Sequence, residues 1–202
     1  YTAGYCDIPN KLPMNGNYTF RIGSNTKTFT GTVLLQLVDE GKLALNDKLS
    51  KYYPEYPKAD SITIAMLCNM SSGIYDYTDH AVWENTMFEN PTKVWTPQEC
   101  VDLGFSENFY FSPGLGWHYS NTNTIILGML IEKLTGNSLE SEIENRIVKT
   151  LKLNNTGLLT SGLNFPGNHG RGYYAGEFGE DDDFTEYSDI SWAWAAGSVY
   201  ST

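Results

Sequence analysis

The feature that most constrains this chain is an abrupt change of hydrophobic period at residue 24. Residues 18–23 alternate apolar or aromatic with small or polar side chains, which is typical of a β-strand. From residue 25 the apolar side chains recur instead at helical spacing: Phe29, Val33, Leu34, Leu37 and Val38. Gly41 then supplies a helix stop. The sequence therefore predicts a strand that runs directly into a helix over residues 25–40, with Ser24 at the junction.

The remaining elements follow from the same periodicity and from turn formers. Residues 1–7 also alternate, so we expect two strands, 1–7 and 18–23, joined by a long hairpin loop. Further helices are predicted over about 62–69, from Thr96, over about 120–135 and from Ser138, the last with the apolar stripe Leu139, Ile143 and Ile147. Tyr173-Tyr174 and Trp192-Ala193-Trp194 indicate strands or buried aromatic packing.

This element order predicts an α/β (α+β) fold in one domain. We expect sheet strands in residues 1–23, a mainly helical region in 24–165, and a mixed region in 166–202 that returns toward the sheet. Neither an internal repeat nor a linker divides the chain.

Charge and composition exclude several functional classes. Acidic residues outnumber basic ones by 24 to 13, giving a net charge of −11, so binding to nucleic acid or to anionic lipid is not expected. No apolar run reaches the roughly 18 residues of a membrane-spanning helix. No signal peptide is visible at the N-terminus, and because the chain begins without Met, we expect it to be a piece of a longer protein.

Metal and disulfide chemistry are also unsupported by the residue spacing. The three histidines lie far apart, and the acidic run 180–183 lacks the spacing of a calcium loop, which favours a solvated turn. The cysteines Cys6, Cys68 and Cys100 have no metal-type spacing. We expect Cys68 and Cys100 to be buried free thiols, with a structural disulfide as the less favoured alternative.

Two short motifs could carry chemistry. Ser24 and Lys27 are three residues apart, so on a helix that begins here their side chains lie within reach of each other. A serine hydroxyl needs a neighbour to remove its proton, and a desolvated lysine can do so. The structural alternative is a helix-capping serine beside a solvated lysine. What favours the chemical interpretation is the strand-to-helix corner, where reactive serines tend to lie.

The second motif is Tyr119-Ser120-Asn121, which follows a Gly- and Pro-rich loop and precedes a helix. A phenol can relay a proton to a leaving group, and an asparagine amide can hold a substrate carbonyl or the lysine. The structural alternative is an aromatic packing residue followed by a capping serine. A Ser-His-Asp hydrolase of the GxSxG type is excluded, because the chain contains no GxSxG.

Taken together, the motifs resemble one family. Residues 20–30 have the frame Phe-x-Ile-Gly-Ser-x-Thr-Lys-x-Phe-Thr. Similar segments follow in order at residues 66–74 (MLCNMSSGI, with Cys-Asn-Met for the usual Ser-His-Thr), 111–121 (FSPGLGWHYSN), 131–136 (IEKLTG), 171–173 (RGY) and 195–202 (AAGSVYST). The chain thus resembles the serine β-lactamases and penicillin-binding D-alanyl-D-alanine carboxypeptidases. It is most similar to the group that joins class C β-lactamases, soluble DD-peptidases, D-amino-acid peptidases and related esterases.

The resemblance implies an antiparallel sheet flanked by helices, with a mostly helical lobe. It also implies that Ser24 is the acylated nucleophile, Lys27 its activating partner and Tyr119 the general base that returns the proton to the leaving group. Asn121 would bind a substrate amide carbonyl and hold Lys27. No metal or organic cofactor is implied. The implied substrate is a small molecule or short peptide, such as a D-alanyl peptide, a β-lactam or an ester, and the implied location is extracytoplasmic.

The resemblance also defines what the chain lacks and which alternatives remain. The family's first helix and first strand would precede Tyr1, and its third motif, a KTG or HxG triplet, would follow Thr202. We therefore expect the fragment alone to be poorly active, because a lost oxyanion donor costs on the order of 100-fold in rate. The residues around Trp117-His118 slightly favour a peptide-type cleft. The alternatives are an esterase of the same family and a non-catalytic binding or regulatory domain with this fold.

Overall fold

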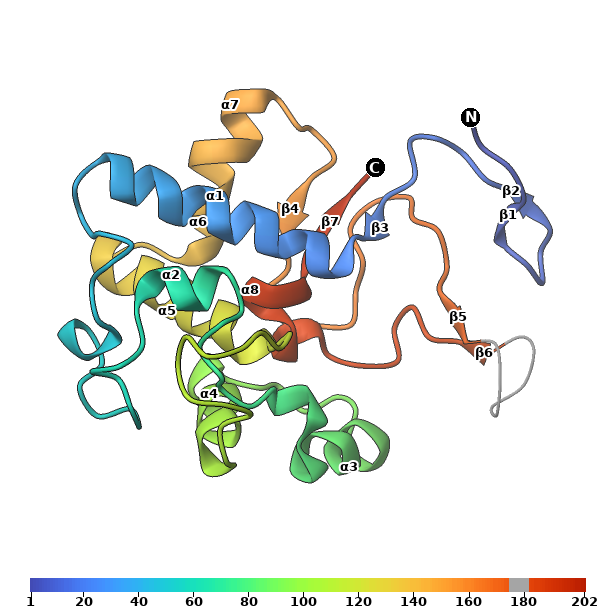
Figure 1. Ribbon diagram of the computed structural model, residues 1–202. Helices are drawn as coiled ribbons and strands as arrows, with labels where there is room; N and C mark the ends of the chain where they lie inside the picture. Colours follow the sequence, from blue (N-terminus) through green and yellow to red (C-terminus); the bar gives the residue numbers. More distant parts are fainter. Residues whose placement is uncertain (175–181) are drawn as a thin grey trace.

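The computed structural model describes residues 1–174 and 182–202 and shows helices grouped around a small antiparallel sheet (Figure 1). The sheet has the order β3–β7–β4, with β3 at Phe20–Arg21, β7 at Val199–Ser201 and β4 at Gly157–Leu158. Both pairings are antiparallel. The C-terminal strand therefore lies between two strands that come from distant parts of the sequence, which confirms the mixed fold of helices and antiparallel sheet.

The helical part contains elements of very different length. The α-helices are α1 (Thr26–Asp39), α2 (Ile64–Cys68), α3 (Ala81–Glu89), α4 (Pro97–Ser106), α5 (Asn121–Thr135), α6 (Leu139–Ile143), α7 (Lys149–Leu151) and α8 (Trp194–Gly197). Short 3-10 turns are η1 (Gly23–Asn25), η2 (Leu49–Lys51), η3 (Tyr77–Asp79) and η5 (Ile190–Trp192), and a π-helical turn, η4 (Glu144–Val148), joins α6 to α7.

The predicted helix boundaries agree closely with these elements. Thr96 begins α4 with a full capping box, in which its side chain and that of Glu99 satisfy each other's backbone N–H groups. Ser138 caps α6 through the Ser141 N–H. Helix α5 ends at Gly136, whose left-handed backbone favours glycine. Local capping chemistry therefore fixes these helix ends.

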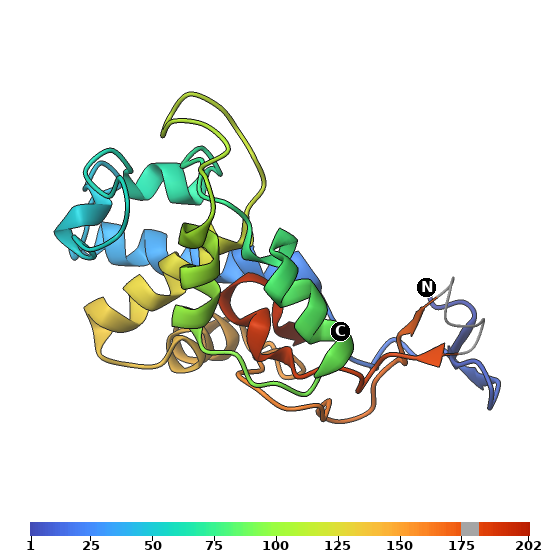
Figure 2. The same cartoon turned by 90° about the horizontal axis from the view of Figure 1, so that it is seen from below.

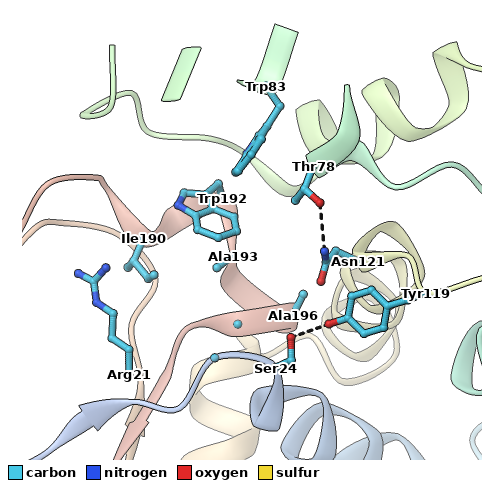
Figure 3. Close-up of a pocket in the computed structure, with 12 residues that line it drawn as sticks. Arg21, Ser24, Thr78, Trp83, Tyr119, Asn121, Ile190, Trp192, Ala193 and Ala196 are labelled. Carbon is cyan, nitrogen blue, oxygen red and sulfur yellow. Dashed lines mark hydrogen bonds between the residues drawn. The ribbon is translucent and has the colours of Figure 1, made fainter. Parts of the chain in front are cut away.

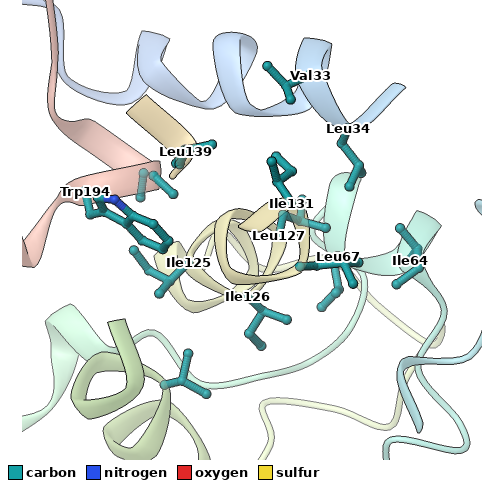
Figure 4. Packing of buried hydrophobic residues seen from close by; sticks show 14 of the residues in the cluster. Val33, Leu34, Ile64, Leu67, Ile125, Ile126, Leu127, Ile131, Leu139 and Trp194 are labelled. Carbon is teal, nitrogen blue, oxygen red and sulfur yellow. The ribbon is translucent and has the colours of Figure 1, made fainter. Parts of the chain in front are cut away.

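Helix α5 is the centre of the core. Its residues 122–128 are all buried, together with Leu130 and Ile131, so the helix is covered on nearly all sides. Val33 and Leu34 of helix α1 belong to the same buried cluster, and Figure 4 shows the Leu34 side chain pointing from α1 toward α5. Each fully buried side chain of this kind contributes roughly 1.5–3 kcal/mol. The core thus joins the two helices whose N-terminal ends carry the candidate motifs.

Helix α8 packs very closely on α5. A Cβ added at Gly128 would lie 2.6 Å from the Cβ of Ala195 and 2.9 Å from the ring of Trp194. Only a residue without a side chain therefore allows this approach. Helix α8 also contacts α1 and leads directly into β7, so the central strand of the sheet lies next to η1, at the start of α1.

Two hairpins form an extension at one end of the molecule. β1 (Tyr5–Asp7) pairs with β2 (Leu12–Pro13), and β5 (Tyr173–Tyr174) pairs with β6 (Asp182–Asp183). The hairpins lie side by side in both views (Figures 1 and 2), and the Ile8 N–H donates to Tyr173 Oη over 2.9 Å. The pair stands apart from the helical part of the fold, and the sheet β3–β7–β4 lies between them.

The expected hairpin between residues 1–7 and 18–23 is wrong. The Asp7 carboxylate accepts hydrogen bonds from the backbone and the side-chain amide of Asn10, both 2.9 Å long. This turn reverses the chain early, so β1 pairs with β2 inside the predicted loop. β3 instead pairs with β7, which lies next to it only because of the tertiary packing.

Three smaller expectations had different outcomes. Of the two alternatives for residues 192–194, buried aromatic packing is confirmed by the burial of Trp194, and no strand forms because Trp192 ends the turn η5, which Asp189 caps. Cys100 is buried and free as expected, whereas Cys68 is free but exposed, since it lies on the outer side of the short helix α2. Residues 180 and 181 of the acidic run lie outside the described residues, whereas Asp182–Asp183 forms strand β6 instead of a turn. In the part of the chain that is described, no helix is long and apolar enough to cross a membrane.

Candidate active site

Ser24 stands at the tip of α1, in the turn η1 that joins β3 to the helix. Gly23 enters this turn with φ of +53°, a conformation that side chains other than glycine rarely adopt. Ser24 is exposed, and the N-cap position of α1 is taken by Asn25. The simple capping role is therefore wrong for Ser24, and its hydroxyl is free to face the positive end of a helix dipole.

Lys27 follows one turn later and connects three structural elements. Its Nζ lies 3.1 Å from Ser24 Oγ, and it donates to Asn121 Oδ1 over 2.7 Å and to the Ala196 carbonyl over 2.9 Å. The last two partners can only accept hydrogen bonds from it. A neutral amine would satisfy both with its two N–H groups, which leaves its lone pair for the Ser24 hydroxyl.

Tyr119 reaches Ser24 from the opposite side of the site. Its phenolic oxygen lies 2.5 Å from Ser24 Oγ, and the two are joined by the dashed line in Figure 3. The ring also lies 4.8 Å from Lys27 Nζ. Tyr119 is 38% exposed, so it is not a buried core residue. The structure therefore brings Ser24, Lys27, Tyr119 and Asn121 into one hydrogen-bonded group.

The loop before Tyr119 is held by backbone contacts with the segment after α2. The His118 N–H donates to Met70 O, and the Gly114 N–H donates to Ser71 O. Gly73 combines a φ of +79° with a close approach, since a Cβ there would lie 2.2 Å from Phe111 O. Residues 66–74 and 111–121, two of the segments that resemble family motifs, are thus in direct contact and hold each other in place.

Helix α1 is also bound to the α8–β7 segment. Thr26 Oγ1 accepts the Val199 N–H over 2.9 Å, and Thr30 Oγ1 donates to Ala195 O over 2.8 Å. With the bond from Lys27 to Ala196 O, three side chains in the first two turns of α1 bind one short segment. This fixes the position of Ser24 relative to the C-terminal part of the chain.

A cavity of about 480 Å³ opens beside Ser24. Tyr119, Asn121 and Thr78 form its polar side, while Trp83 of α3 and Trp192 of η5 form an aromatic side (Figure 3). The remaining lining residues are Arg21, Gly23, Ile190, Ala193, Ala196 and Gly197. A concave site with a few converging polar groups is what small-molecule binding requires.

Several residues of this site were not predicted. Trp83, Trp192 and Thr78 carried no signal beyond their residue types, because tertiary packing alone brings their segments together. Trp117 and His118, which favoured a peptide-type cleft, are not among the lining residues. The ring of His118 stacks on Tyr110 instead, with 3.7 Å between the ring centroids.

Burial shifts the protonation equilibrium of Lys27 toward the neutral amine. Burial lowers the pKa of Lys27 below the ordinary lysine value, while the hydrogen bond to Tyr119 and the charges of Tyr119 and Asp76 act in the opposite direction. A lysine with a lowered pKa is suited to accept a proton from a neighbouring hydroxyl. Among the described residues, no group of three or more His, Cys, Asp or Glu side chains could hold a metal ion.

Comparison with known proteins places this arrangement in a family. The beta-lactamase family model matches residues 1–202. Penicillin-binding protein 4* of Bacillus subtilis (strain 168) is 32% identical over 160 residues, which cover 77% of this chain and 34% of the relative. Protein flp of Staphylococcus aureus (strain COL) is 32% identical, with 76% and 30% covered. The chain therefore spans about a third of the length of these curated relatives.

Solved structures of amide-cleaving enzymes are also similar. The D-amino acid amidase of Ochrobactrum anthropi SV3, complexed with L-phenylalanine amide, is 34% identical with a TM-score of 0.88, over 99% of this chain and 57% of that one. A D-stereospecific amidohydrolase of Streptomyces sp. is 35% identical with a TM-score of 0.87, over 93% and 58%. With the family match over its whole length, the chain belongs to the beta-lactamase family, a family of the serine-hydrolase type.

Proposed function

We propose that the protein is a serine hydrolase that cleaves amide bonds of D-amino acid amides or D-peptides through an acyl-enzyme on Ser24. The observation that carries this proposal is the contact of Ser24 Oγ with two proton-transfer groups, Tyr119 Oη at 2.5 Å and Lys27 Nζ at 3.1 Å, at the mouth of a cavity. A hydroxyl placed in this way can be activated and can later be regenerated.

The first step forms the acyl-enzyme bond. Ser24 Oγ attacks the substrate carbonyl carbon, its proton moves to Lys27 Nζ, and the carbonyl π-electrons move to the oxygen. The positive dipole end of α1 then lies beside the developing negative charge and stabilises it. Asn121 Oδ1 and the Ala196 carbonyl stabilise the ammonium that forms on Lys27.

The second step expels the amine. The C–N bond breaks while Tyr119 Oη gives its proton to the leaving nitrogen, and Lys27 returns a proton to Tyr119 across their hydrogen bond. Water then attacks the ester, loses its proton to the same pair of groups, and Ser24 regains its own. No proton is left over at the end of the cycle.

The substrate class is supported by the cavity and by the relatives. Trp83 and Trp192 offer aromatic surface for an apolar or aromatic side chain. The similar solved structures are enzymes named for D-amino acid amides and for D-stereospecific hydrolysis. We therefore choose D-phenylalanine amide as the first probe.

The experiment compares hydrolysis of D- and L-phenylalanine amide by the whole protein and by its Ser24→Ala variant. We expect turnover of the D-amide, slower turnover of the L-amide, and none above background with Ser24→Ala. Equal turnover by the protein and by Ser24→Ala would contradict the proposal. Turnover of esters alone would instead identify an esterase.

A second candidate function is covalent binding of penicillins. It is favoured by the similarity to a protein named penicillin-binding protein 4*. A fluorescent penicillin would label Ser24 in both cases, but the label persists in a penicillin-binding protein and is released in a lactamase. An unlabelled protein that also leaves amides and esters intact would indicate the non-catalytic alternative.

A further inference from the structure

Asp76 is a buried carboxylate that lies directly behind Asn121. Its residue is 4% exposed, and it is not among the residues that line the cavity. Asn121 Nδ2 lies 3.0 Å from Asp76 Oδ2 and 3.3 Å from Asp76 Oδ1. Asp76 therefore contacts the hydrogen-bonded group of Ser24, Lys27, Tyr119 and Asn121 through the Asn121 amide, and it does not line the cavity in which a substrate would bind.

Asp76 is itself held in place from two sides. Its Oδ1 accepts the Thr78 N–H over 3.2 Å, which makes it the cap of the turn η3. Its own N–H donates to Tyr110 Oη over 3.2 Å. A carboxylate fixed in this way can impose a direction on the group that it contacts.

We propose that Asp76 is a positioning residue that holds the Asn121 amide in the single orientation that offers its oxygen to Lys27. The inference rests on the proposed function, because it assigns a task to Asp76 in the activation of Ser24. The chain of contacts runs from Asp76 to Asn121 Nδ2, from Asn121 Oδ1 to Lys27 Nζ, and from there to Ser24 Oγ.

The orientation follows from donor and acceptor types. An ionised carboxylate only accepts hydrogen bonds, so it selects the NH₂ end of the amide and turns the oxygen toward Lys27. In the flipped amide, the oxygen would face the carboxylate and the NH₂ would face the N–H groups of Lys27. Both contacts would then be repulsive. Thr78 Oγ1, 3.3 Å from Nδ2, supports the same orientation but can also donate, so it does not select it alone.

Asp76 also adds a negative charge near the lysine. The charged or titratable groups that act on Lys27 are Tyr119 and Asp76, whereas its other partners, Ser24, Asn121 and the Ala196 carbonyl, are neutral. The Asp76 charge raises the pKa of Lys27 and so partly offsets the effect of burial. Loss of the charge lowers that pKa.

The test is the rate of Ser24 acylation against pH in the protein and in Asp76→Asn, with a chromogenic ester or a fluorescent penicillin as the acyl donor. Asn keeps the shape but can present either an oxygen or an NH₂ group. We expect the plateau rate to fall about tenfold, as for the loss of one buried hydrogen-bond partner. We also expect the acid limb of the pH profile to move to lower pH.

Asp79→Asn is the matched control. Asp79 lies in the same turn, and its Oδ2 accepts the Tyr110 hydroxyl over 3.0 Å instead of contacting Asn121. The substitution removes the same charge, so an unchanged plateau and acid limb are expected. An Asp76→Asn profile equal to that of Asp79→Asn would overturn the inference.

Two further measurements separate positioning from a folding defect. In the Asn121→Ala background, Asp76→Asn should no longer lower the plateau rate, because the group through which it acts is gone. Asp76→Glu keeps the charge but moves the carboxylate, so the plateau should fall while the acid limb stays in place. A further fall in the Asn121→Ala background would count against the inference.

The outcome also separates this inference from the proposed function. If Ser24 of the unmodified protein is not acylated by any donor, the proposed function fails. If Ser24 is acylated and Asp76→Asn has the plateau and acid limb of the unmodified protein, the positioning role alone fails.

Discussion

The two sides of the cavity are built in different ways. The side formed by the tips of α1 and α5 is a connected polar group, in which Ser24, Lys27, Tyr119 and Asn121 each have a hydrogen-bond partner in the group. The side formed by α3 and η5 is aromatic. Within the described residues, the indole N–H groups of Trp83 and Trp192 and two guanidinium nitrogens of Arg21 are buried without a hydrogen-bond partner.

This difference separates chemistry from recognition. The polar side fixes its atoms within hydrogen-bonding distance, as proton transfer requires. The aromatic side offers area and shape, which discriminate among substrates by smaller free-energy differences. We therefore expect substitutions on the polar side to affect the rate of the chemical step and those on the aromatic side to affect mainly substrate preference.

The largest effect is expected for Ser24→Ala. Loss of the nucleophile removes the acyl-enzyme route, so kcat should fall by about 10,000-fold or more. Steady-state hydrolysis of D-phenylalanine amide measures this fall. If Ser24→Ala kept an activity within tenfold of the unmodified protein, the polar side would not carry out the chemical step.

The next effect is expected for Lys27→Met, which keeps much of the volume but removes the amine. The rate should fall about 1,000-fold. In the unmodified protein, the rate should rise with pH as Lys27 loses its proton. Because burial lowers the pKa of Lys27, this rise should lie below the ordinary lysine value of 10.5. The pH profile of Lys27→Met should lack it, and a retained rise would show that another group is the base.

Tyr119→Phe should distinguish the role of the phenol from the roles of the other residues on the polar side. The phenol is proposed to protonate the leaving group, so the loss should depend on how much the leaving group needs a proton. We expect about 100-fold for an amide and tenfold or less for an activated ester. The ratio of kcat/KM for the amide and the ester, compared between Tyr119→Phe and the unmodified protein, measures this dependence. Equal losses for both substrates would contradict the role of Tyr119 as the proton donor to the leaving group.

The smallest effect is expected on the aromatic side. Trp192→Leu should change kcat/KM by about tenfold for D-phenylalanine amide and less for D-alanine amide, with kcat nearly unchanged. Kinetics on the two amides test this directly. A large fall in kcat for both would mean that the aromatic side also positions the reacting groups.

The four residues of the polar group could be predicted from the sequence, whereas the aromatic side of the cavity could not. Ser24 and Lys27 could be paired because three residues along a helix define a distance, and Tyr119 and Asn121 because a Gly- and Pro-rich loop and a helix start enclose them. Asp76, Trp83 and Trp192 come from three separate segments, and only the packing around α5 brings them together.

The fold shows the same division between local and distant contacts. Helix starts such as Thr96 and Ser138 could be predicted, because a cap depends on residues three positions away. The partner of β3 could not be predicted, because β7 lies nearly 180 residues further along the chain. The side chain of Asp7, which closes the first hairpin early, carries a turn signal that the alternating pattern concealed.

The most direct test of the central claim is to locate the covalent adduct by mass spectrometry after incubation with an acyl donor and acid quenching. The account predicts one acyl group per chain, on the peptide that contains Ser24, and none in Ser24→Ala. An adduct on any other residue, or an adduct that survives in Ser24→Ala, would contradict it.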